Sequence, residues 1–290
     1  MTPMRRPGKP EQPVVHRLKA AAEDRHTVYL VHPGALDASV HRALAEALPE
    51  GTGLTVLDLG GVAEYWQAAL TGGHADTTLD ALASSLMTAV RVGCGDDRYL
   101  LAGWSFGGVV AHAMTALAGP GRLPSRLVLL DSIAPVDAFK HEDDALEPAL
   151  LLDWFAMYLG AKRGRPLPVE RERLAGLGTE DGLKVLLEAA IAAGVLLPST
   201  PLPGLRKLYD TYVDGLLRNN RLTLPHRPTP SPVPVVLVRA ARGLLPDGGA
   251  MGWESLAPHG LDVRRCPGDH YTMLSRPDAA VTVASLLTDP

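Results

Sequence analysis

This 290-residue chain has few cysteines, lacks long apolar runs and carries little excess of either charge. Only Cys94 and Cys266 are present, which excludes a disulfide framework, fits a reducing cytoplasm and leaves open a single bridge between the two. No apolar run approaches the roughly 18 residues that a membrane span needs. The net charge of -4 gives no sign of binding to nucleic acid or a membrane surface. The composition therefore predicts a cytoplasmic protein with neither of these partners.

The two ends of the chain differ in character. Residues 1–26 are charged and Pro-rich and contain no apolar signal-peptide core, so a linker is expected there, followed by one domain over residues 27–290. A linker in front and a predicted helix at the far end suit a domain cut from the end of a longer polypeptide. An ordinary frayed N-terminus is the alternative.

Apolar, β-branched runs alternate with helical patterns through most of the chain. Strands are expected at residues 27–31, 54–58, 98–103, 126–131, 234–240 and 261–265. Helices are expected at residues 37–48, 77–92, 107–118 and 276–287. This alternation predicts an α/β fold, with a mostly parallel central sheet flanked by helices.

Residues 133–230 interrupt the alternation with amphipathic helical patterns and no strand between them. A separate helical bundle is one alternative. A helical lid over the C-terminal edge of the sheet is the preferred interpretation, because α/β enzymes bind ligands at that edge. Apolar side chains of such a lid would wall a substrate channel, and the candidates are Trp154, Phe155, Leu186, Leu187, Leu208 and Tyr212.

The stretch GWSFG, residues 103–107, matches the pattern G-x-S-x-G between a predicted strand and a predicted helix. A nucleophile at such a sharp turn sits in strained backbone, and its neighbours must be small. The helix N-terminus would direct backbone N–H groups at a developing oxyanion. A glycine-rich turn with an incidental serine is the alternative. The pattern predicts Ser105 as a nucleophile.

A serine nucleophile needs a base, and the base needs an acid that orients it. His270 lies in a Pro-Gly loop after the last predicted strand and fits the order Ser, acid, His. Asp131 ends the strand after the serine helix, beside the serine strand, and is the preferred acid. Asp247, which follows the next strand, is the alternative, but it needs a long Gly-rich loop to fold back.

The N–H groups of an oxyanion hole are expected from two places. One donor would be the N–H of Phe106, and the second would come from Gly34 or Ala35 in the loop after the first predicted strand. Pro33 has no N–H, and His32 is expected to shape this loop.

With these residues assembled, the chain resembles the type I thioesterase domains that end modular polyketide synthases and non-ribosomal peptide synthetases. GWSFGG is similar to their nucleophile elbow, LLDSIAP to the strand end with their acid, and PGDHYTML to their histidine segment. The resemblance covers about residues 27 to 288 and supports Ser105, Asp131 and His270 as the triad. It implies an α/β-hydrolase fold with a helical lid inserted after the strand that ends at Asp131.

The resemblance also implies a substrate and a partner. The expected reaction is release of an acyl or peptidyl chain from the phosphopantetheine thioester of a carrier domain through an acyl-serine, by hydrolysis or macrocyclisation. No bound cofactor and no metal is expected, and a homodimer is left open. The alternatives are a free-standing editing thioesterase or general serine esterase, and a non-catalytic relative that binds a ligand.

Overall fold

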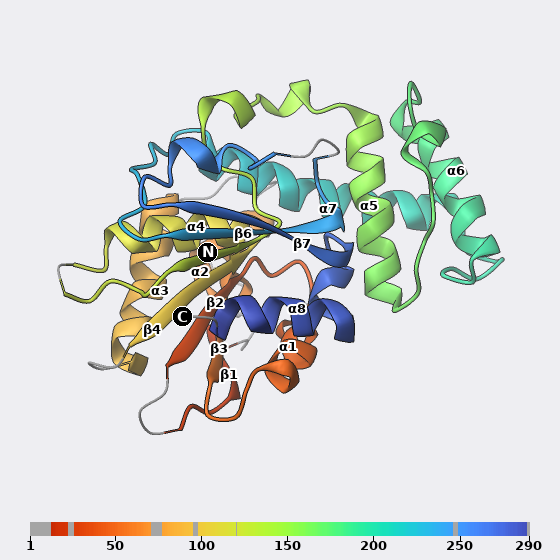
Figure 1. Ribbon diagram of the computed structural model, residues 1–290. Coiled ribbons are helices and arrows are strands. Elements are labelled where there is room, and N and C mark those ends of the chain that lie inside the picture. Colours follow the sequence, from red (N-terminus) through yellow and green to blue (C-terminus); the bar gives the residue numbers. More distant parts are fainter. Residues whose placement is uncertain are drawn as a thin grey trace, which may run out of the picture.

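The computed structural model describes residues 13–22, 26–70, 77–94, 98–119, 121–245 and 249–288. Within these residues seven strands form one sheet (Figure 1). In spatial order they are β1 (Val15–Lys19), β3 (Gly53–Asp58), β2 (Thr27–His32), β4 (Tyr99–Trp104), β5 (Leu127–Leu130), β6 (Val235–Arg242) and β7 (Leu261–Asp269). β1 runs antiparallel to β3, and every other neighbouring pair is parallel.

The mostly parallel sheet confirms the predicted fold class. The central strands are buried on both faces, as β4 and β5 show along their whole length, and such burial explains why they read as continuous apolar runs. The prediction of a linker over residues 1–26 is wrong for Val15–Lys19, which form the edge strand β1. An edge strand pairs on one side only and is half exposed here, so its sequence carries a weak apolar signal.

Helices cover both faces of the sheet. On one side α1 (Arg42–Ala47) packs against α8 (Pro277–Thr288), and on the other α3 (Leu79–Cys94) packs against α4 (Phe106–Ala116) (Figure 1). The expected helix over residues 37–48 begins as a 3₁₀ turn, Ala38–His41, before α1. One further helix, α2 (Ala63–Leu70), lies in a segment for which the sequence predicts no helix.

The predicted helical insertion between β5 and β6 is present. It contains α5 (Pro148–Arg163), α6 (Thr179–Ala192) and α7 (Leu202–Thr223), and α5 and α6 lie beyond the ends of β6 and β7 (Figure 1). We call residues 133–230 the lid. Its helices contact one another, and α7 also contacts α2 of the sheet domain.

Two expectations from composition concern the cysteines and membrane spans. Cys94 and Cys266 are not joined by a disulfide, so the single bridge that the sequence left open does not form. None of the helices in the described ranges is long and apolar enough to cross a membrane.

Candidate active site

Ser105 occupies the turn between β4 and α4. Its backbone has φ 55° and ψ −129°, a conformation that non-glycine residues rarely adopt, and its N–H donates to the Leu130 carbonyl at 2.9 Å. The flanking glycines are required by packing. A Cβ at Gly103 would collide with the Gly107 carbonyl, and a Cβ at Gly107 would collide with the carbonyl of Val31 on β2. The GWSFG stretch is therefore a strained strand-to-helix turn held by close backbone contacts.

Asp131 and His270 form a buried hydrogen bond. His270 Nδ1 lies 2.7 Å from Asp131 Oδ2, and both side chains are almost fully buried. The carboxylate also accepts from the N–H groups of Ala240 (3.3 Å) and Leu244 (3.1 Å). Since the carboxylate accepts, Nδ1 of the neutral imidazole carries the proton and Nε2 is left as the basic nitrogen.

The strand ends bring this pair to the serine. β4 and β5 are in register with Trp104 opposite Leu130, so Ser105 and Asp131 are the next residues along two adjacent strands. The indole N–H of Trp104 donates to the His270 carbonyl at 3.0 Å, and the two rings lie 5.1 Å apart. The three residues predicted as a triad thus gather at one edge of the sheet. The alternative acid, Asp247, lies outside the described residues.

The loop after β2, where the second oxyanion donor is expected, is held by two buried histidines. His32 Nε2 donates to the Leu36 carbonyl at 2.8 Å, so its Nδ1 must accept from His41 Nε2 at 3.0 Å. Burial lowers the pKa of both rings, and that of His41 well below its ordinary value. Gly34 lies in this loop with φ 75°, and the residue is exposed. The contact with Leu36 is the loop-shaping role expected of His32.

Tyr65 on α2 is a residue that the sequence did not point to. Its hydroxyl accepts from Arg218 Nη2 at 2.9 Å and donates towards Asn219 Oδ1 (2.7 Å) and the Pro33 carbonyl (3.0 Å). Its ring stacks on Phe106, with the planes 7° apart. Tyr65 therefore touches both expected sources of oxyanion donors and the lid helix α7, a role that no local sequence pattern encodes.

The expected channel residues divide into three groups. Phe155 and Leu186 have no exposed surface and lie in the packing between helices, so they reach no open channel in this structure. Trp154 and Tyr212 are nearly buried, and the Tyr212 hydroxyl lies 2.8 Å from that of Tyr271, next to His270. The two leucines of the set, Leu187 and Leu208, are half-buried.

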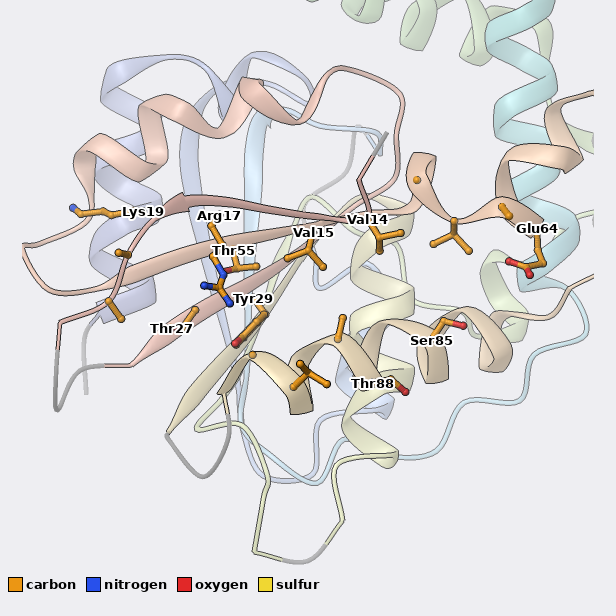
Figure 2. A pocket seen from close by; sticks show the side chains of 18 of the residues that line it. Val14, Val15, Arg17, Lys19, Thr27, Tyr29, Thr55, Glu64, Ser85 and Thr88 are labelled. Carbon is orange, nitrogen blue, oxygen red and sulfur yellow. The ribbon is translucent and has the colours of Figure 1, made fainter. Parts of the chain in front are cut away.

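A cavity of 1190 Å³ lies on another part of the molecule, against β1, β3, β2, α2 and α3 (Figure 2). Its described lining includes Val15, Arg17, Thr55, Glu64 and Thr88, and no residue of the Ser105 site. The residues predicted as nucleophile, base and acid lie instead at the strand edge, where Ser105 follows β4 and the Asp131–His270 hydrogen bond follows β5. Within the described residues no group of three or more His, Cys, Asp or Glu side chains could hold a metal ion.

Comparison with known proteins decides the family. A family model described as the thioesterase domain matches residues 26–289. The chain belongs to the thioesterase domain family. This confirms the resemblance at the level of the thioesterase domain family.

Two of the matched proteins are much longer than this thioesterase domain. It is 24% identical over 306 residues to orsellinic acid synthase of Beauveria bassiana, covering 96% of this chain and 13% of that protein. It also superposes on a four-domain non-ribosomal peptide synthetase bound to AMP and glycine, at 24% identity and a TM-score of 0.62, covering 96% of this chain and 20% of that one. The thioesterase domain thus spans about an eighth and a fifth of these two relatives.

Two further thioesterase structures match over nearly their whole length. The NocB thioesterase domain from the nocardicin cluster is 24% identical with a TM-score of 0.56, covering 95% of this chain and 99% of that one. RedJ thioesterase from the prodiginine pathway of Streptomyces coelicolor is 18% identical with a TM-score of 0.55, covering 93% and 95%. At these identities the structural matches show the shared fold.

Proposed function

We propose that this thioesterase domain releases a polyketide or peptide acyl chain from the phosphopantetheine thioester of a carrier domain, through an acyl-Ser105 intermediate. The observation that carries the proposal is the 2.7 Å hydrogen bond from His270 to Asp131, at the sheet edge where the strained Ser105 turn ends β4. Family membership supplies the thioester as the substrate class.

In the acylation step, Ser105 Oγ attacks the thioester carbon while His270 Nε2 takes its proton. Asp131 holds the imidazole in the tautomer that leaves Nε2 free and stabilises the imidazolium that forms. The negative charge on the carbonyl oxygen is received by the N–H of Phe106, at the start of α4, and by a loop N–H of Gly34 or Ala35. Each such donor contributes about 10²–10³ in rate in comparable enzymes. The C–S bond then breaks, and His270 returns the proton to the departing thiolate.

In the second step the acyl-serine is discharged by water or by a nucleophile within the chain itself. His270 takes the proton of the attacking group, and the ester C–O bond to Ser105 breaks with the proton passing to Oγ. Water gives a free acid, and an internal hydroxyl or amine gives a macrocycle. The half-buried side chains of the lid are proposed to select between these outcomes by controlling water entry.

The partners follow from this chemistry. The protein would act on a small-molecule acyl chain presented by an acyl or peptidyl carrier domain, whose phosphopantetheine arm is part of the substrate. The steps above require no resident cofactor. A cytoplasmic location is proposed because the two thiols form no disulfide.

Covalent labelling tests the proposal. A fluorophosphonate probe should label the wild-type protein at Ser105, and Ser105→Ala should lose labelling while its circular dichroism and melting temperature stay unchanged. With a carrier-bound acyl chain, mass spectrometry should detect acyl-Ser105 and then a free acid or a ring. Equal labelling of the alanine variant, or release that does not depend on Ser105, would contradict the proposal.

A further inference from the structure

Three consecutive residues at the end of β6, Arg242, Gly243 and Leu244, connect the Asp131–His270 pair with the lid. We call them the linking segment. Towards the pair, the Leu244 N–H donates to Asp131 Oδ2 at 3.1 Å, and the Arg242 carbonyl accepts from the His270 N–H at 3.0 Å. A Cβ at Gly243 would lie 2.6 Å from Asp131 Oδ1, so the segment packs directly against the carboxylate. The position of this segment therefore fixes the surroundings of both members of the pair.

The same segment is bonded to the lid on its other side. The indole N–H of Trp154, on α5, donates to the Leu244 carbonyl at 2.9 Å. Arg171, in the stretch between α5 and α6, donates through Nη2 to the Gly243 carbonyl at 3.4 Å. Two adjacent carbonyls of the linking segment are thus held by lid side chains.

A buried ion cluster completes the connection. Asp153 on α5 has no exposed surface and is paired with Arg171 Nη2 at 2.6 Å and with Arg242 Nη2 at 2.5 Å. Arg242 Nη2 also donates to the Val169 carbonyl of the lid at 2.8 Å. A buried carboxylate between two guanidinium groups resists displacement, because moving either partner leaves a charge uncompensated.

We propose that the linking segment makes the alignment of Asp131 and His270 depend on docking of the lid, with Asp153, Arg171 and Trp154 as positioning residues. Each residue of the segment carries at least one bond or close contact towards the pair and one bond towards the lid. A shift of α5 against the sheet should therefore also move the Arg242 carbonyl, which accepts from the His270 N–H, and the Leu244 N–H, which donates to Asp131. This inference rests on the proposed function only for its kinetic consequence, and the geometric coupling stands without it.

Kinetics on a small substrate provide the first test. The acetyl thioester of N-acetylcysteamine is too short to need the lid for its acyl chain. Arg171→Gln should lower kcat on it by about 10- to 100-fold, since small misplacements of catalytic groups cost that much, with a smaller change in KM. Arg206→Gln is the matched control, because it also removes an Arg–Asp pair of the lid (2.8 Å to Asp210) but touches no part of the linking segment. The kcat of Arg206→Gln should stay within about twofold of the wild-type value.

A spectroscopic readout separates this inference from the proposed function. The proton between His270 Nδ1 and Asp131 should give a downfield NMR resonance, assigned by its loss in Asp131→Ala. Arg171→Gln should shift or broaden that resonance, and Arg206→Gln should not. This comparison holds even if no thioester is turned over, in which case the function fails and the coupling stands.

A milder variant guards against loss of folding. Trp154→Phe removes only the N–H that reaches Leu244 and keeps most of the ring packing, so it should move the resonance and kcat in the same direction as Arg171→Gln, by less. If Arg171→Gln unfolds the lid, Trp154→Phe decides the question. An unchanged resonance and an unchanged kcat in the folded variants would overturn the inference.

Discussion

At the scale of single residues, the site concentrates backbone strain. Ser105 and Asp131 both have positive φ, 55° and 44°, although neither is a glycine. Such conformations cost on the order of 1–3 kcal/mol each and persist only where the surroundings over-determine them. Close backbone contacts of Gly103 and Gly107 hold the Ser105 conformation. Hydrogen bonds hold that of Asp131, and their partners are His270, Ala240 and Leu244. The strain lies on the two residues whose side chains must point out of the sheet edge.

The choice of acid gives a prediction at this scale. Asp131→Asn should lower turnover of a simple thioester by about 10²–10⁴, because an amide at this position favours the wrong histidine tautomer. Measured kcat/KM against wild type, with folding checked by circular dichroism, gives the comparison. Asp247→Asn is the matched control and should change turnover far less. The reverse ranking would show that the acid is misassigned and would favour an editing thioesterase.

At the scale of elements, α4 is buried from Phe106 to Thr115 and carries a histidine in its interior. His112 packs its ring against Trp253, with the centroids 5.1 Å apart. Burial, followed by the charge of nearby His226, lowers the pKa of His112 to about 4. The helix that begins directly after Ser105 therefore buries a neutral imidazole.

This burial predicts an acid-dependent loss of stability. In the unfolded chain His112 takes up a proton below about pH 6.5, whereas in the folded chain it stays neutral down to about pH 4. The unfolded state then binds more protons, so the free energy of unfolding should fall as the pH drops through this window, by about 1.4 kcal/mol per pH unit for this group. Urea unfolding at several pH values gives the free energy of unfolding as a function of pH. This free energy should change less steeply with pH in His112→Leu than in wild type. Parallel slopes would mean that His112 is protonated in the fold.

Sequence patterns predicted the elements whose signals are local. The buried strands, the Ser105 turn and the helix after it lie within single short stretches, and parallel topology then placed Asp131 beside the serine strand. β1 was missed because an edge strand with half-exposed residues lacks a strong apolar pattern. The sequence did not point to Tyr65 and Arg242, because partners of both lie far along the chain, on the lid. Local hydrophobic periodicity does not show how the lid packs against the sheet domain.

At the scale of the whole molecule, the lid is attached to the sheet domain through two separate groups of contacts near the site. On one side Asn219 and Arg218 of α7 hold Tyr65, which contacts the loop of the expected oxyanion donors. On the other side the Asp153 cluster holds Arg242 of the linking segment. Both attachments end on groups that contact the proposed catalytic machinery, so lid position and active-site geometry are parts of one arrangement.

The lid residues that remain half-buried supply the last prediction. Leu187 and Leu208 still reach accessible space, unlike Phe155 and Leu186, so a larger side chain there can narrow the path of an acyl chain without disrupting the helix packing. Leu208→Trp should reduce turnover of long-chain N-acetylcysteamine thioesters relative to short ones by about 10-fold or more, the scale of roughly 1.4 kcal/mol. Labelling of Ser105 by a small fluorophosphonate should stay unchanged. Leu197→Trp, at a lid position that is 71% exposed, is the matched control and should leave the chain-length profile as it is. If Leu208→Trp and Leu197→Trp give the same profile as wild type, selection of the acyl chain does not occur at α7.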